Sequence, residues 1–118
     1  MASTKTAKTL LTSQSLAAAT PVNATEWNMS TAYGGMYTVK LTNGASAPTT
    51  APVLVIYIGE STGTKRELFR ASGDTVANSI NHYCVEIPQS VMFANATITN
   101  GATNAITVEA YGQELTSI

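Results

Sequence analysis

The sequence predicts an all-β protein: an antiparallel β-sandwich or barrel of about six or seven strands with an N-terminal arm. From residue 36 onward, apolar and polar residues alternate in short segments, and turn residues such as Asn-Gly and Pro separate these segments. Thr, Ala and Ser supply 46 of the 118 positions, whereas Leu, Ile, Val and Phe supply only 24. We therefore expect one domain with a small core. The net charge of −1 is too low to favour disorder.

The first clear strand is expected at residues 36–44 (MYTVKLTNG), where every second residue is apolar and Asn43-Gly44 closes the strand as a turn. The next segment, residues 45–52, contains two prolines that cannot donate backbone hydrogen bonds. It is therefore expected to cross the end of the fold as an extended loop. Residues 53–58 (VLVIYI) form an unbroken apolar run, which indicates a strand in the middle of the core.

Residues 66–71 (RELFRA) predict a hairpin partner for that strand, because Gly59 and a polar segment separate the two runs. Residues 80–87 again alternate, with one side facing the core and the other facing outward. The expected core side carries Tyr83, Val85 and Ile87, and the opposite side carries His82, Cys84 and Glu86.

The C-terminal part predicts one short helical turn at residues 91–94, a strand at residues 96–99 and an Asn100-Gly101 turn into residues 106–115. These last two strands are expected to form a terminal hairpin. The first 35 residues have no clean period. We divide the chain into residues 1–35, an N-terminal arm or added edge strand, and residues 36–118, the β-sandwich domain.

Several classes of protein are disfavoured by composition. The longest apolar run has six residues, far short of the roughly 18 needed for a membrane-spanning helix. Polar residues interrupt the only stretch that resembles a signal peptide, residues 1–21, so export is not expected. Cys84 is the only cysteine, which excludes an intrachain disulfide and fits a reducing cytoplasm. Six scattered Lys and Arg residues cannot form the basic stripe that nucleic-acid binding needs.

The candidate catalytic and cofactor motifs are incomplete. Residues 59–65 (GESTGTK) resemble a phosphate-binding loop, but the spacing of the glycines and lysine is wrong and a strand follows; a polar hairpin tip is the simpler interpretation. His82 and Cys84 lack the third ligand that a metal site needs, and no nucleophile motif accompanies the single His. We expect no cofactor and no metal. Two of the six glutamates could meet in space as the paired carboxylates of a glycoside hydrolase, but solvent-facing charges are the simpler interpretation for all of them: Glu26, Glu60, Glu67, Glu86, Glu109 and Glu114.

Residues 39–75 (VKLTNGASAPTTAPVLVIYIGESTGTKRELFRASGDT) and 84–115 (CVEIPQSVMFANATITNGATNAITVEAYGQEL) resemble small virion structural proteins of tailed bacteriophages. The shared features are Thr/Ala-rich strands, an APTTAP crossover and a terminal strand pair. The resemblance implies a non-enzymatic β-sandwich in the virion, assembled in the host cytoplasm. It further implies a capsid decoration (cement) protein that clasps neighbouring subunits of the major capsid protein.

A thin core suggests help from neighbouring copies, so a homo-oligomer, with a trimer favoured, is expected. The arm carries two lysines and no acid, and it could reach across an acidic neighbour. The predicted partner-binding residues are Lys5, Lys8, Leu10, Leu11 and Leu16, with Trp27 as the anchor. The alternative is a tail or baseplate module that binds a receptor or glycan. Trp27, Tyr33 and Tyr37 could form a sugar platform, although packing of the arm onto the body is favoured.

Overall fold

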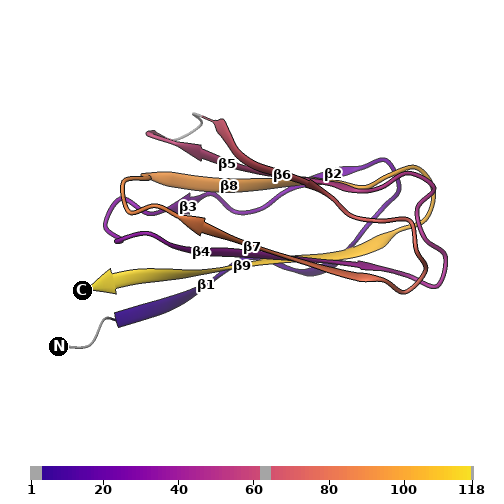
Figure 1. Cartoon of the computed structure of the whole chain (residues 1–118), viewed down its shortest axis with the longest axis horizontal. Helices are drawn as coiled ribbons and strands as arrows, with labels where there is room; N and C mark the ends of the chain where they lie inside the picture. The colour runs from indigo at the N-terminus through magenta and orange to yellow at the C-terminus, as the bar shows by residue number, and fades with distance from the viewer. Residues whose placement is uncertain (1–3, 62–64, 118) are drawn as a thin grey trace.

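The computed structural model describes residues 4–61 and 65–117 and contains two antiparallel sheets packed face to face (Figure 1). The all-β prediction is confirmed, and the described residues form nine strands in place of the expected six or seven. No helix occurs among the described residues, so none there could cross a membrane. The expected helical turn at residues 91–94 is wrong, because β8 begins at Phe93 and pairs with β5 from its first residue.

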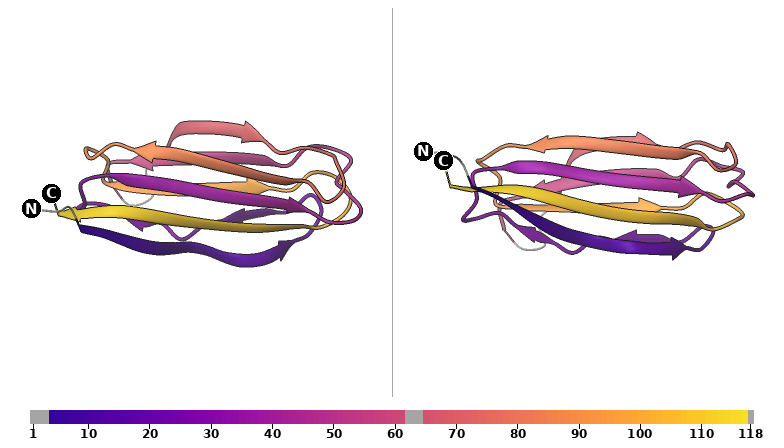
Figure 2. Two further views of the ribbon diagram at one scale, coloured as in Figure 1. Left: turned by 60° about the horizontal axis from the view of Figure 1, so that its bottom comes forward. Right: turned by 90° about the horizontal axis from the view of Figure 1, so that it is seen from below.

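Sheet A has the strand order β1-β9-β4-β7, and Figure 2 shows these four strands side by side from below. Sheet B has the order β2-β8-β5-β6, and the short β3 also pairs with β8. Sheet A consists of β1 (Thr4–Leu16), β9 (Ile106–Ser117), β4 (Gly35–Asn43) and β7 (Ile80–Ile87). Sheet B consists of β2 (Pro21–Asn23), β8 (Phe93–Thr99), β5 (Val53–Gly59), β6 (Arg66–Ser72) and β3 (Trp27–Asn28).

The core lies between the sheets, where alternate residues of each strand point inward. On β4, Tyr37, Val39 and Leu41 are almost fully buried, as their spacing predicts. On β5, Leu54 and Ile56 have no exposed surface, which confirms that this strand crosses the middle of the core. The predicted hairpin of β5 and β6 is confirmed by their antiparallel pairing, although residues 62–64 of the predicted tip lie outside the described residues.

The predicted terminal hairpin is wrong, because β8 belongs to sheet B and β9 to sheet A. The Asn100-Gly101 pair forms a corner between the sheets instead of a two-residue turn. Asn100 is buried, and its Nδ2 donates to the carbonyls of Leu16 at 3.0 Å and Asn104 at 2.9 Å. A Cβ on Gly101 would lie 1.7 Å from the carbonyl oxygen of Thr50. This pair therefore allows three chain segments to approach closely.

The N-terminal segment forms β1, a 13-residue strand at the edge of sheet A that pairs with β9. Its register shifts between Thr9 and Leu11 and again between Leu11 and Gln14. Because of the first shift, Leu10 and Leu11 are both buried although they are consecutive. The division of the chain at residue 35 stays a prediction.

Candidate functional site

The outer face of sheet A is a candidate surface for binding another molecule, because it spans four paired strands. The register aligns its outward side chains in rows across the sheet, such as Gln113-Met36-Glu86. Every side chain in these rows is exposed or half-buried. We call this surface the sheet A face, and define it by Lys5, Met36, Thr38, Lys40, Thr42, Ile80, His82, Cys84, Glu86, Thr107, Glu109, Tyr111 and Gln113.

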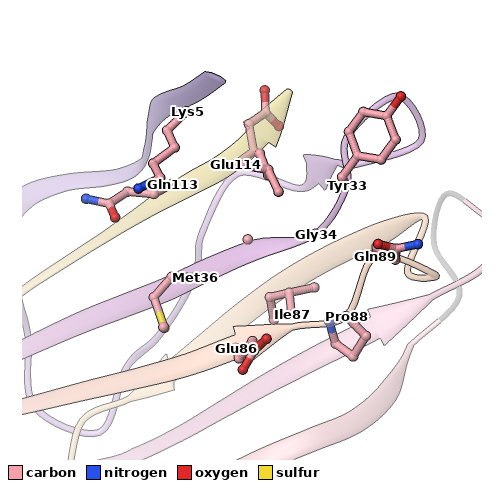
Figure 3. A pocket seen from close by; sticks show the side chains of 12 residues that line it. Lys5, Tyr33, Gly34, Met36, Glu86, Ile87, Pro88, Gln89, Gln113 and Glu114 are labelled. Atoms are coloured by element: carbon pink, nitrogen blue, oxygen red, sulfur yellow. The ribbon is translucent and has the colours of Figure 1, made fainter. Parts of the chain in front are cut away.

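Two hollows lie on the sheet A face. The first, the terminal groove, has a volume of about 510 Å³ and lies at the end of the sandwich where β1 begins and β9 ends. Figure 3 shows Lys5, Met36, Glu86 and Gln113 around it, each from a different strand of sheet A. The second, of about 330 Å³, lies farther along the same strands between Lys40, His82 and Tyr111. Together they make the face uneven enough to receive protruding side chains.

Two glycines form the floor of the terminal groove. Gly34 has a φ of +82°, a conformation that side chains rarely adopt, and a Cβ there would lie 2.6 Å from the carbonyl oxygen of Ile87. A Cβ on Gly35 would lie 2.2 Å from the carbonyl oxygen of Gln113. The backbone beside them is held by hydrogen bonds from Leu115 N to the Gly34 oxygen and from Tyr33 N to the Leu115 oxygen. The floor is therefore tightly packed backbone.

Charge on the sheet A face is balanced and sparse. Lys40 Nζ lies 3.8 Å from Glu109 Oε1, and Glu109 also accepts a hydrogen bond of 3.2 Å from the Tyr111 hydroxyl. This hydrogen bond and the neighbouring carboxylate raise the pKa of Tyr111. Lys5 and Glu86 have no side-chain partner among the described residues. Within the described part of the chain, the face thus presents one cation and one anion without an ion-pair partner.

The catalytic arrangements considered from the sequence are not assembled in the described part of the chain. His82 and Cys84 both point outward from β7, but no group of three His, Cys, Asp or Glu residues there could hold a metal ion. The single Asp, Asp74, is engaged elsewhere: it accepts hydrogen bonds from Ser79 Oγ at 2.5 Å and Asn81 Nδ2 at 3.0 Å. These bonds lower the pKa of Asp74 and do not orient His82.

Four of the six predicted partner-binding residues lie in the core of this chain. Leu10, Leu11 and Leu16 hold β1 against the body, and Trp27 packs edge-on against Tyr37 with ring centroids 5.9 Å apart. The expectation that these four side chains are available to a partner is therefore not met in this structure, since each is at most 8% exposed. Lys5 and Lys8, both on β1, remain exposed.

The aromatic residues considered as a sugar platform separate in the structure. Trp27 and Tyr37 are buried together, and only Tyr33 is exposed, at the rim of the terminal groove (Figure 3). Packing of the arm onto the body is therefore the role that Trp27 and Tyr37 take.

Among the glutamates, Glu114 is the one that the sequence analysis expected at the surface but that is buried in the structure. It is 8% exposed, and its Oε2 accepts a 2.9 Å hydrogen bond from Trp27 Nε1 while its Oε1 lies 3.5 Å from Lys8 Nζ. This buried cluster joins β1, β3 and β9, and so connects both sheets. The sequence contains a pattern that predicts this burial, because Glu114 continues the inward alternation of Ile106, Val108 and Ala110 along β9.

Comparison with known proteins identifies a fold and no family. No family model matches the chain, and no curated protein matches it. A structure of Bacillus endospore appendages, described as disulfide-linked pili, is 18% identical with a TM-score of 0.59, over 100% of this chain and 93% of that one. The SPBc2 prophage-derived protein YomS is 18% identical with a TM-score of 0.52, over 96% of both chains.

A structure of infectious bursal disease virus, Gx strain, is 13% identical with a TM-score of 0.65. The match covers 96% of this chain but only 32% of the viral chain, so this chain spans about a third of that protein's length. What these proteins share with the chain is the fold. A β-sandwich of this kind occurs in pilus, viral and prophage-derived proteins.

Proposed function

We propose that this protein is a non-enzymatic structural subunit of a tailed-phage virion, a capsid decoration (cement) protein that binds neighbouring major capsid protein subunits. The fold supports this proposal, because solved structures with the same fold include a viral protein and a prophage-derived protein. A sandwich of small polar residues with few charges can approach another protein with little desolvation cost. Many weakly attached copies on a lattice then hold firmly through multivalency.

The observation that carries the proposal is the free backbone edge of β1. This strand lies at the end of the sheet A order, so its outer edge has no strand partner among the described residues. The register with β9 is regular from Lys5 to Thr9, and the outward N–H and C=O groups of this segment have no backbone partner among the described residues. Such an edge can accept a strand of a neighbouring protein.

The two lysines of β1 restrict which strand can pair there. Lys5 and Lys8 lie within the regular segment and discourage indiscriminate pairing with other sheet edges. They favour a capsid strand that carries acidic side chains. In this mechanism, the buried leucines and Trp27 fix β1 to the body, so that the force on the capsid contact is transmitted to the whole sandwich.

Proline substitution on β1 tests the edge contact. Adjacent residues of a strand direct their N–H groups to opposite sides, so either Thr6 or Ala7 has its N–H turned away from β9. Of Thr6→Pro and Ala7→Pro, we expect one to lose thermal stability and the other to keep it. The stable variant and the unchanged protein are then incubated with capsids that lack the protein, and bound protein is measured after sedimentation.

We expect the stable proline variant to bind capsids at least about tenfold more weakly, because it removes a backbone donor and adds a steric block at the edge. Unchanged capsid binding by that variant would contradict attachment through the β1 edge. Failure of the unchanged protein to bind capsids at all would contradict the decoration role.

A further inference from the structure

The four charged side chains of the sheet A face lie on four different strands, with cations and anions on opposite strands of the sheet. Lys5 lies on one edge strand, β1, and Glu86 lies on the other, β7. In the middle, Lys40 on β4 is the register partner of Glu109 on β9. The face therefore has no net charge, and on each side of the line between β9 and β4 a cation lies on one strand and an anion on the matching strand.

Lys5 and Glu86 differ from the other charged residues of the described chain. The remaining described Lys, Arg, Asp and Glu side chains each make an ion pair, a hydrogen bond or a ring contact within the chain. Lys5 and Glu86 make none with residues 4–61 and 65–117, yet both line the terminal groove, as Figure 3 shows. A partner that fits this surface would supply an anion opposite Lys5 and a cation opposite Glu86.

We propose that this partner is a second copy of the chain, with the two sheet A faces packed against each other about a two-fold axis. The axis runs parallel to the strands, between β9 and β4. This rotation places β1 of one copy over β7 of the other, and β9 over β4. Lys40 then faces Glu109 of the second copy directly. Lys5 lies on the strand opposite Glu86 of the second copy but two residues farther along, since Lys5 pairs with Leu115 whereas Glu86 shares the row of Gln113 and Met36. This offset of about 7 Å is one that two long side chains can span, and each pair occurs twice.

The apolar side chains of the face support the same pairing. Met36, Ile80 and Tyr111 are between 36% and 51% exposed, and three of the seven large exposed apolar residues of the described chain therefore lie on this one face. Under the two-fold rotation, Met36 packs near Gln113 of the second copy, and Tyr111 packs near Thr38 of the second copy. Packed sheets lie about 10 Å apart, a gap that these long side chains can fill from both sides.

The available area is sufficient for a reversible dimer. Four strands spaced about 4.8 Å apart give a width of about 19 Å. The nine residues of β4 give a length of about 30 Å. The footprint is then about 570 Å² per copy, or about 1,100 Å² in total, at the lower end of the range for specific interfaces. We therefore infer a dissociation constant in the micromolar range. The sequence favoured a trimer, whereas this face is self-complementary only for a pair.

A charge-reversal cycle tests the dimer by sedimentation equilibrium of the full chain. We expect the unchanged protein to reach twice the 12.3-kDa chain mass as its concentration rises through about 1–100 μM. Lys5→Glu and Glu86→Lys should each raise the dissociation constant at least about tenfold, because each opposes like charges twice in the dimer. The double variant Lys5→Glu/Glu86→Lys should restore dimerisation. Lys65→Glu, which changes a charge beside Tyr57 on sheet B, is the matched control and should have no effect.

The thiol of Cys84 gives an independent readout, because it is exposed and belongs to the sheet A face. Its alkylation rate should fall as the unchanged protein dimerises, and should stay high in the Lys5→Glu variant at the same concentration. Circular dichroism verifies that each variant is folded. The proposal would be overturned if the unchanged protein were a monomer at all concentrations or a trimer. It would also be overturned if both single variants were folded and the double variant did not recover dimerisation. An alkylation rate independent of concentration would do the same.

Discussion

Substitution of Gly112 by alanine probes the buried cluster that fixes β1 to the body. Gly112 lies on β9 against the ring of Trp27, and an added Cβ would lie 2.7 Å from Cη2 and 2.8 Å from Cζ3. Carbon atoms pack best at about 3.5–4.0 Å, so the ring would have to move by about 0.8 Å. It has little room, because Trp27 is 2% exposed and also packs edge-on against Tyr37, with ring centroids 5.9 Å apart.

The expected loss of stability follows from three contributions. Overpacking costs about 1–3 kcal/mol. Lengthening the Trp27–Glu114 hydrogen bond removes part of the about 1.5–3 kcal/mol that such a bond to a charged group provides. Alanine regains about 0.4–1 kcal/mol by restricting the unfolded chain. The net loss is then about 1–3 kcal/mol, which for a chain of 118 residues lowers the melting temperature by about 4–12 °C.

Thermal unfolding followed by circular dichroism and tryptophan fluorescence measures this loss. Trp27 is the only tryptophan, so its emission reports on the cluster directly. Gly44→Ala is the control, because the nearest atom to its added Cβ is the Ala105 oxygen at 3.9 Å. If Gly112→Ala melts at the same temperature as Gly44→Ala, the packing argument for Trp27 is refuted.

Three further predictions concern buried or hydrogen-bonded polar groups. Glu114→Gln should lower the free energy of unfolding by at most about 1 kcal/mol, because it keeps an acceptor for Trp27 Nε1 and loses only the ion pair with the half-exposed Lys8. Glu114→Leu leaves the indole N–H unpaired and should lower it by about 1–3 kcal/mol. Urea unfolding distinguishes the two variants, and equal losses would contradict the assigned hydrogen bond. Tyr37→Phe should raise the free energy of unfolding by up to about 1 kcal/mol, because the buried Tyr37 hydroxyl has no hydrogen-bond partner among the described residues. A lower melting temperature for this variant would show that the hydroxyl is hydrogen-bonded. Asp74→Ala should destabilise the protein at neutral pH. The hydrogen bonds that Asp74 accepts lower the pKa of its carboxyl group from the ordinary value of 3.8. The stability that they contribute is therefore present above pH 3.8 and is lost as the pH falls below that value. Melting curves from pH 7 to pH 3 should therefore converge for the variant and the unchanged protein, and a constant difference would contradict this assignment.

Alternation predicted those strands whose two faces have different environments. Residues 36–44 and 80–87 form β4 and β7 within a residue or two, because the register of an antiparallel strand exposes one face and buries the other. The unbroken apolar run at residues 53–58 predicted β5 by its composition instead, and residues 66–71 form its hairpin partner β6. Alternation did not reveal β1. The register shifts of this strand bury two consecutive leucines, Leu10 and Leu11, and so remove the period of two from the sequence.

The connection between β8 and β9 could not be predicted locally. An Asn-Gly pair between two alternating segments is typical of a hairpin, but the sequence does not say whether the two strands share a sheet. The deciding interactions are long-range, such as the hydrogen bond from Asn100 to the Leu16 carbonyl. The outward position of Cys84 and Glu86 on the sheet A face followed from alternation, whereas the position of Lys5 depended on the register of β1 with β9.

Electron microscopy of intact virions tests the decoration role most directly. We expect additional density of the two-sheet sandwich on the outer surface of the capsid, repeated with the lattice, with the β1 edge against the capsid protein. Density at the tail or baseplate would support the receptor-binding alternative and contradict decoration. Purified virions without this protein would contradict a structural role in the particle.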